Sequence, residues 1–69
     1  MEQWKVKNNK GYSRTYMLQQ GAKRDYGIQS KLIADNWGDE SAPLWVQMHY
    51  RKNDAEKWLI IQEFMIESE

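Results

Sequence analysis

The most regular pattern of hydrophobic and polar residues lies in residues 44–51. Its apolar positions alternate with mostly polar ones: Leu44, Val46, Met48 and Tyr50 against Trp45, Gln47, His49 and Arg51. A period of two residues is typical of a strand with one buried face. The alternation therefore predicts a strand over residues 44–51.

A second apolar run, over residues 57–66, follows a polar break that contains Asn53-Asp54. Two such runs around a polar turn predict a β-hairpin. We expect Tyr50 to face Trp58 and Met48 to face Ile60 across this hairpin. We also expect the hairpin to form the centre of the core, with Val46, Ile60 and Phe64 buried.

A helix is the competing prediction for residues 54–67. Asn53 followed three residues later by Glu56 is a helix start signal. A helix here would place Glu56, Glu63 and Glu67 on one side. The β-branched and aromatic content of the segment favours a strand instead, and both alternatives stay open at this point.

The N-terminal segment predicts another hairpin, with strands over residues 3–8 and 12–19 around Asn9-Lys10-Gly11. A three-residue loop with a left-handed Gly11 pairs Val6 with Arg14 and Trp4 with Tyr16. This register buries the aromatic residues. A four-residue loop would shift the pairing by one residue and display them instead.

The middle of the chain has weaker signals. Residues 20–25 resemble a turn, residues 26–34 a third strand, and residues 35–43, which contain Asn, Gly, Ser and Pro, a loop. The sequence thus predicts a mostly β fold: one small antiparallel sheet or barrel-like meander of about five strands, at 3–8, 12–19, 26–34, 44–51 and 57–66. The runner-up is a four-stranded sheet with a C-terminal helix.

Composition places residues 1–69 in one small domain. The chain has no cysteine, so disulfides and thiolate metal sites are excluded, and four Trp and four Tyr are the expected source of buried area. No segment is apolar enough for a membrane-spanning helix or a signal peptide, so we expect a cytoplasmic protein that does not bind membranes. The sequence leaves the oligomeric state open.

Charge is divided between the two halves of the chain. Residues 1–34 carry seven basic and two acidic side chains, 7 − 2 = +5, and residues 35–69 carry three basic and eight acidic, 3 − 8 = −5. Such asymmetry indicates an interaction surface, although two halves that pair in one sheet would interleave the same charges.

Catalytic and metal-binding patterns are weak. His49 is the one histidine and has no cysteine or nucleophile motif beside it, so we expect a surface histidine and no enzymatic activity. The acidic residues around Asn36 do not match the spacing of a calcium loop. We therefore expect neither a metal ion nor a cofactor.

A protein partner is the first functional prediction. Trp37 lies in a loop among acidic residues, and Trp residues are enriched at the centres of protein interfaces. We expect a non-enzymatic binding or regulatory module whose contacts are Asp35, Trp37, Asp39, Glu40 and Trp45. The competing role for Trp37 is to fold back and cover an open end of the sheet.

The alternative function is the binding of single-stranded DNA or RNA. The N-terminal hairpin combines cations with aromatic rings: Lys5, Lys7, Tyr12, Arg14 and Tyr16. Stacked bases and neutralised phosphates are the usual basis of such binding. The net charge of zero argues against a strong electrostatic attraction to phosphates. The register of the N-terminal hairpin decides whether these rings are buried or displayed.

Overall fold

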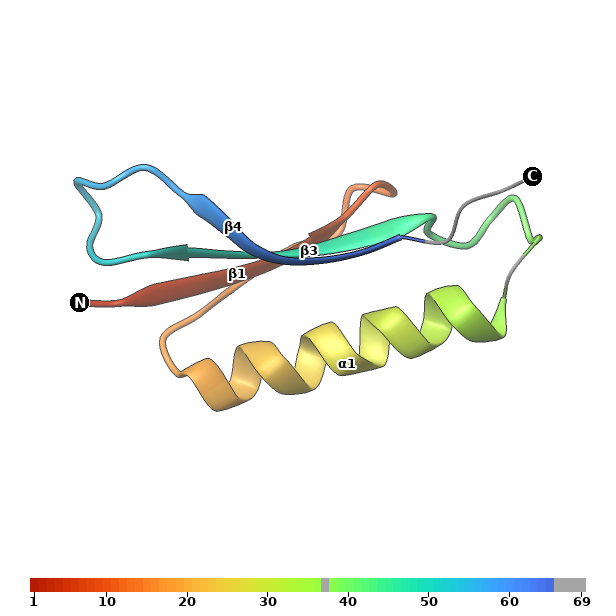
Figure 1. Ribbon diagram of the computed structural model, residues 1–69, viewed down its shortest axis with the longest axis horizontal. Coiled ribbons are helices and arrows are strands. Elements are labelled where there is room, and N and C mark those ends of the chain that lie inside the picture. The colour runs from red at the N-terminus through yellow and green to blue at the C-terminus, as the bar shows by residue number, and fades with distance from the viewer. Residues whose placement is uncertain (37, 66–69) are drawn as a thin grey trace.

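A computed structural model describes residues 1–36 and 38–65 of the chain (Figure 1). Its elements are β1 (Gln3–Asn8), β2 (Ser13–Tyr16), α1 (Gln19–Asp35), β3 (Trp45–Arg51) and β4 (Leu59–Met65). The four strands form one sheet in the order β2-β1-β3-β4, and every neighbouring pair is antiparallel. Figure 1 shows α1 lying along one face of this sheet.

The expected mostly β fold with one small antiparallel sheet is confirmed. The four strands and single helix match the runner-up, except that the helix lies between β2 and β3 and not at the C-terminus. The prediction of a strand over residues 26–34 is wrong, because this segment forms most of α1. The second strand is also shorter than expected and ends at Tyr16.

The covered face of α1 explains why its segment folds as a helix. The buried and half-buried residues recur with helical spacing: Ala22, Asp25, Tyr26, Gln29, Ser30 and Ile33. Three of these six side chains are polar, so the helical period is hidden in a purely hydrophobic pattern. Ile28 and Leu32, which suggested a strand, remain about half exposed on the helix surface.

The N-terminal hairpin has the three-residue-loop register, one of the two that the sequence leaves open. Trp4 pairs with Tyr16 and Val6 with Arg14. Gly11 has φ +92°, the left-handed conformation that favours glycine. The Asn8 side chain supports the turn, because its Oδ1 accepts hydrogen bonds from the backbone N–H groups of Lys10 and Tyr12.

The C-terminal hairpin is also present, so the helix alternative for residues 54–67 is wrong over the described residues. Its register differs from the expectation: Tyr50 faces Leu59, and Met48 faces Gln62. A bulge opposite Met48 and His49 inserts Ile61 as an extra residue in β4. The bulge interrupts the regular alternation on which the expected pairing depended.

The core lies between α1 and the middle of the sheet. Val6, Ile33, Val46 and Met48 are its largest fully buried side chains, and Trp4 and Ala22 complete the cluster. Val46 is buried as expected and Phe64 is half-buried, whereas Ile60 is 56% exposed. The expected burial of Ile60 is wrong, since the bulge turns its side chain away from the helix.

Candidate functional site

The aromatic residues of the N-terminal hairpin contact the helix. The Tyr12 and Tyr16 hydroxyls donate hydrogen bonds of 2.6 and 2.7 Å to Asp25 Oδ2, and Gln29 Nε2 donates to Asp25 Oδ1 at 3.3 Å. Burial, followed by the hydrogen bond to Asp25, raises the pKa of both phenols above the usual value. These rings connect β2 to α1 and do not form an exposed stacking platform.

Two of the three cations expected to work with these rings lie elsewhere. Trp4 and Val6 face the helix, so the intervening Lys5 and the following Lys7 point to the opposite face of the sheet. Arg14 is exposed, with Cζ 5.7 Å from the centre of the Tyr16 ring. The proposed nucleic-acid set therefore does not form one surface: Lys5 and Lys7 are separated by the sheet from Tyr12 and Tyr16.

The predicted acidic contacts of the loop over residues 35–43, here called the acidic loop, are exposed: Asp35, Asp39 and Glu40. Asp39 Oδ1 accepts hydrogen bonds from the backbone N–H and the hydroxyl of Ser41, and these bonds lower the pKa of Asp39. Lys10 Nζ donates to the Glu40 carbonyl oxygen at 2.8 Å. Asp35 is the last residue of α1. Trp37, the central residue of the predicted protein-binding set, lies outside the described residues.

Trp45 follows the acidic loop by two residues and is part of the sheet. It begins β3 and pairs with Met65, on the side opposite the buried Val46. Its backbone N–H and that of Leu44 both donate to Asn9 Oδ1. Trp45 thus belongs to the face of the sheet that α1 does not cover.

We call this side of the sheet the open face. No helix of the described part of the chain covers this face (Figure 1). Its side chains are identified by the strand registers and by contacts with Trp58. They are Gln3, Lys5 and Lys7 of β1, Trp45, Gln47, His49 and Arg51 of β3, Ile60, Glu63 and Met65 of β4, and Trp58, which precedes β4.

Trp58 contacts basic side chains of two strands, close to the end of β3. Lys5 Nζ lies 4.5 Å from the centre of its ring, and Arg51 Cζ lies 4.3 Å from it. Cations at these distances are attracted to the negative face of an indole ring. Burial and the nearby charges of Lys7 and Arg51 lower the pKa of Lys5. Two basic side chains from neighbouring strands therefore contact a half-buried Trp.

A polar chain continues across the same face to β4. Gln47 Nε2 donates to Glu63 Oε2 at 2.5 Å, which turns Gln47 Oε1 towards His49 Nε2 at 3.1 Å. Nε2 must then carry the proton of a neutral His49, and Nδ1 is buried with no hydrogen-bond partner among the described residues. Burial, together with the charges of Lys5 and Lys7, lowers the pKa of His49.

Trp58 and Arg51 were not among the functional residues predicted from the sequence. Both belong to the hairpin that was recognised, but the regular alternation placed Trp58 opposite Tyr50. The bulge places Leu59 there instead and leaves Trp58 on the open face. One signal in the sequence could have indicated this site. Two Lys residues occupy alternate positions of the first strand, and the C-terminal hairpin contains a Trp.

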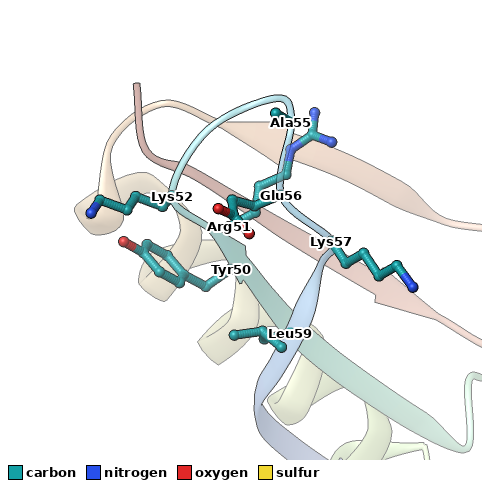
Figure 2. A pocket seen from close by; sticks show the side chains of 7 residues that line it. All are labelled: Tyr50, Arg51, Lys52, Ala55, Glu56, Lys57 and Leu59. Carbon is teal, nitrogen blue, oxygen red and sulfur yellow. The ribbon is translucent and has the colours of Figure 1, made fainter.

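An open hollow of about 590 Å³ lies inside the loop between β3 and β4. It is lined by Tyr50, Arg51, Lys52, Ala55, Glu56, Lys57 and Leu59 (Figure 2). Figure 2 shows the side chains of Lys52 and Lys57 extending to opposite sides of the loop. These two lysine side chains therefore do not converge on one point of the hollow.

Known proteins provide no assignment for this arrangement. No family model matches the chain, and no curated protein or solved structure matches it significantly. Within residues 1–36 and 38–65, no group of three or more His, Asp or Glu side chains is placed to hold a metal ion. In the same residues, no helix is long and apolar enough to cross a membrane.

Proposed function

We propose that this protein is a non-enzymatic binding module that recognises another protein through the open face of its sheet. The partner surface combines acidic side chains with apolar ones. The acidic side chains meet Lys5, Lys7 and Arg51, and the apolar ones meet Trp58 and Ile60. This proposal retains the predicted protein partner and moves the contact surface away from the acidic loop.

The contact of Trp58 with Lys5 and Arg51 carries the proposal. Trp and Arg are the side chains that most often dominate binding energy at protein interfaces. The two contacts also hold the cations in fixed positions, so less conformational entropy is lost when a partner carboxylate binds. Arg51 is further held by Gln3 Oε1 and by an ion pair of 3.8 Å with Asp54.

A protein fits the open face better than a nucleic acid does. Glu63 lies on this face and would repel phosphates, and Ile60 and Met65 are more than half exposed beside it. The net charge of the whole chain is zero, so long-range attraction to a polyanion is weak. Binding of single-stranded DNA or RNA is the alternative outcome of the experiment below.

Site-specific photo-crosslinking in cells of the source organism tests the proposal. A photoreactive amino acid at Lys7, on the open face, is expected to give discrete protein adducts that survive nuclease treatment. The same amino acid at Lys31, on the exposed surface of α1, is the matched control and is expected to give none. Arg51→Gln combined with crosslinking at Lys7 should reduce the adducts by about tenfold, as for an interface Arg.

Three results would contradict the proposal. Adducts at Lys7 that disappear with nuclease would assign the open face to nucleic acid. Equal adducts at Lys7 and Lys31 would indicate unspecific contact, and a lack of adducts at Lys7 would exclude the open face as the docking surface. Circular dichroism of each variant verifies that the sheet is intact.

A further inference from the structure

His49 is enclosed by its neighbours on the open face. It is 8% exposed and lies between Lys5 of β1 and Ile60 of β4 in the strand registers. Gln47 Oε1 lies 3.1 Å from Nε2, whereas Nδ1 has no hydrogen-bond partner in the described part of the chain. A proton gained at Nδ1 would therefore be buried without an acceptor, which is unfavourable.

Basic side chains dominate the surroundings of His49. Lys5 is its cross-strand neighbour, Lys7 lies at the next open-face position of β1, and Arg51 follows it by two residues on β3. Glu63 of β4 is hydrogen-bonded to the neighbouring glutamine, and α1 lies on the other side of the sheet. Burial and the charges of the two lysines disfavour the imidazolium, so the pKa of His49 is lowered.

An acidic partner on the open face would change these two effects unequally. His49 is already more than nine-tenths buried, so a partner that covers the face adds little further burial. Carboxylates that pair with Lys5 and Lys7 would bring negative charge beside the same two amines and offset their repulsion of the imidazolium. The bound protein would then take up a proton more readily than the free protein does.

We propose that binding of an acidic partner to the open face is coupled to proton uptake by His49, so that the partner binds more tightly at lower pH. The coupling is reciprocal, because a partner that favours protonated His49 is itself favoured by protonation. Exposed carboxylates of a partner stay ionised between about pH 5.5 and 7.5, so within this range the change is carried by the imidazole. This inference rests on the proposed function, since it requires an acidic partner on this face.

Isothermal titration calorimetry with poly-L-aspartate, in two buffers of different ionisation enthalpy, measures affinity and proton uptake together. The wild type is expected to bind about fivefold more tightly at the lower end of this pH range than at the upper end, with uptake of a fraction of one proton. His49→Gln should bind with no proton uptake and with the same affinity at both ends. Lys7→Gln should weaken binding more than the matched control Lys31→Gln, which removes the same charge from the exposed surface of α1.

NMR titration of the His49 ring provides a second readout that needs no substitution. In the wild type, saturating poly-L-aspartate should raise the pH at which the ring titrates. Binding that Lys7→Gln weakens more than Lys31→Gln does, but without proton uptake, would overturn this inference and leave the proposed function intact. Proton uptake that persists in His49→Gln would overturn the assignment to His49. A lack of binding, or equal weakening by both lysine substitutions, would contradict the proposed function itself.

Discussion

Asp25 shows how one buried carboxylate can organise several parts of a small domain. It is 7% exposed and accepts hydrogen bonds from two tyrosines of the N-terminal hairpin and from Gln29 one helical turn later. A buried carboxylate is costly unless its lone pairs are satisfied. The three donors satisfy Asp25 and fix the position of the helix against β2.

Gly21 permits the close approach that these hydrogen bonds require. A Cβ atom at this position would lie 2.9 Å from Tyr16 Cδ1, and the Tyr16 ring is held at its other end by Asp25. The ring therefore cannot move aside cheaply. A glycine inside a helix costs some stability, and here the cost is offset by packing.

We predict that Gly21→Ala and Gly27→Ala shift stability in opposite directions. Gly21→Ala should destabilise the fold by about 1–3 kcal/mol through overpacking. Gly27 has open space at its Cβ position, so Gly27→Ala should stabilise the fold by about 0.5–1 kcal/mol through helix propensity. Urea unfolding measures both. Stabilisation by both substitutions would show that the contact between Gly21 and Tyr16 is not tight.

His49 leads to a prediction of pH dependence. Its folded-state pKa is lowered, because protonation would place a second N–H and a positive charge at the buried Nδ1, near Lys5 and Lys7. The unfolded chain therefore binds the proton more readily than the folded chain does. Stability contributed by neutral His49 is present above about pH 6.5 and is lost as the pH falls through the folded pKa.

The measurement is urea unfolding between about pH 5.5 and 7.5, above the range in which exposed carboxylates titrate. Wild-type stability is expected to fall as the pH decreases, and His49→Gln should remove most of this slope. NMR titration of the His49 ring provides the folded pKa directly. A ring that titrates above 6.5, or a slope that survives in His49→Gln, would contradict the assigned burial.

At the scale of elements, the two hairpins differ in how far the sequence predicts them. The first was predicted with two possible registers, and the one that forms has the three-residue loop with a left-handed Gly11. The second was predicted in existence but not in register. A bulge adds one residue to one strand, and the apolar run of residues 58–61 is compatible with several positions for it.

A matched pair of substitutions can test which side chains of the C-terminal hairpin face the helix. Met48 is 1% exposed beneath the helix, so Met48→Ala should cost about 2–5 kcal/mol. Ile60 is on the open face and more than half exposed, so Ile60→Ala should cost less than about 1 kcal/mol. Thermal and urea unfolding at low protein concentration provide both values. A larger loss of stability for Ile60→Ala than for Met48→Ala would show that the core does not lie on the helix side of the sheet.

The helix α1 was missed because its buried face is half polar. Asp25, Gln29 and Ser30 lie on the covered side, whereas Ile28 and Leu32 lie on the exposed side. The hydrophobic pattern alone would place the polar residues on the exposed side and the two apolar residues on the buried side. No side chain caps the N-terminus at Leu18, and no acidic residue lies in the first turn, so the usual start signals are absent as well.

At the scale of the whole molecule, the charge division of the sequence is only partly neutralised in the fold. β1 from the basic half pairs with β3 from the acidic half, but Lys5 faces His49 and Lys7 faces Gln47. Arg51–Asp54 is the ion pair found among the described residues. Lys5 and Lys7 of the open face therefore have no ion pair among the described residues.

Only some residues of the candidate site could be predicted from the sequence, and their grouping could not. Lys5, Lys7 and Trp45 were named from the sequence and do lie on the open face, but the two lysines were assigned to the nucleic-acid set and Trp45 to the protein-binding set. Their grouping depends on which strands are adjacent and on where β4 changes phase. Both are properties of long-range pairing, which a local pattern of residues does not specify.

The bulge at Ile61 has a consequence for how such a surface is inherited. Without the extra residue opposite His49, the unchanged segment would alternate regularly, and Trp58 and Ile60 would turn towards the helix while Leu59 and Ile61 would turn outward. Lys5 and Arg51 would then lose their aromatic contact. The open face is therefore encoded by the spacing of residues as much as by their identity. Among descendants of this chain, loss of the bulge would exchange the residues that the segment 58–61 contributes to the open face, whereas most single substitutions would modify this face gradually.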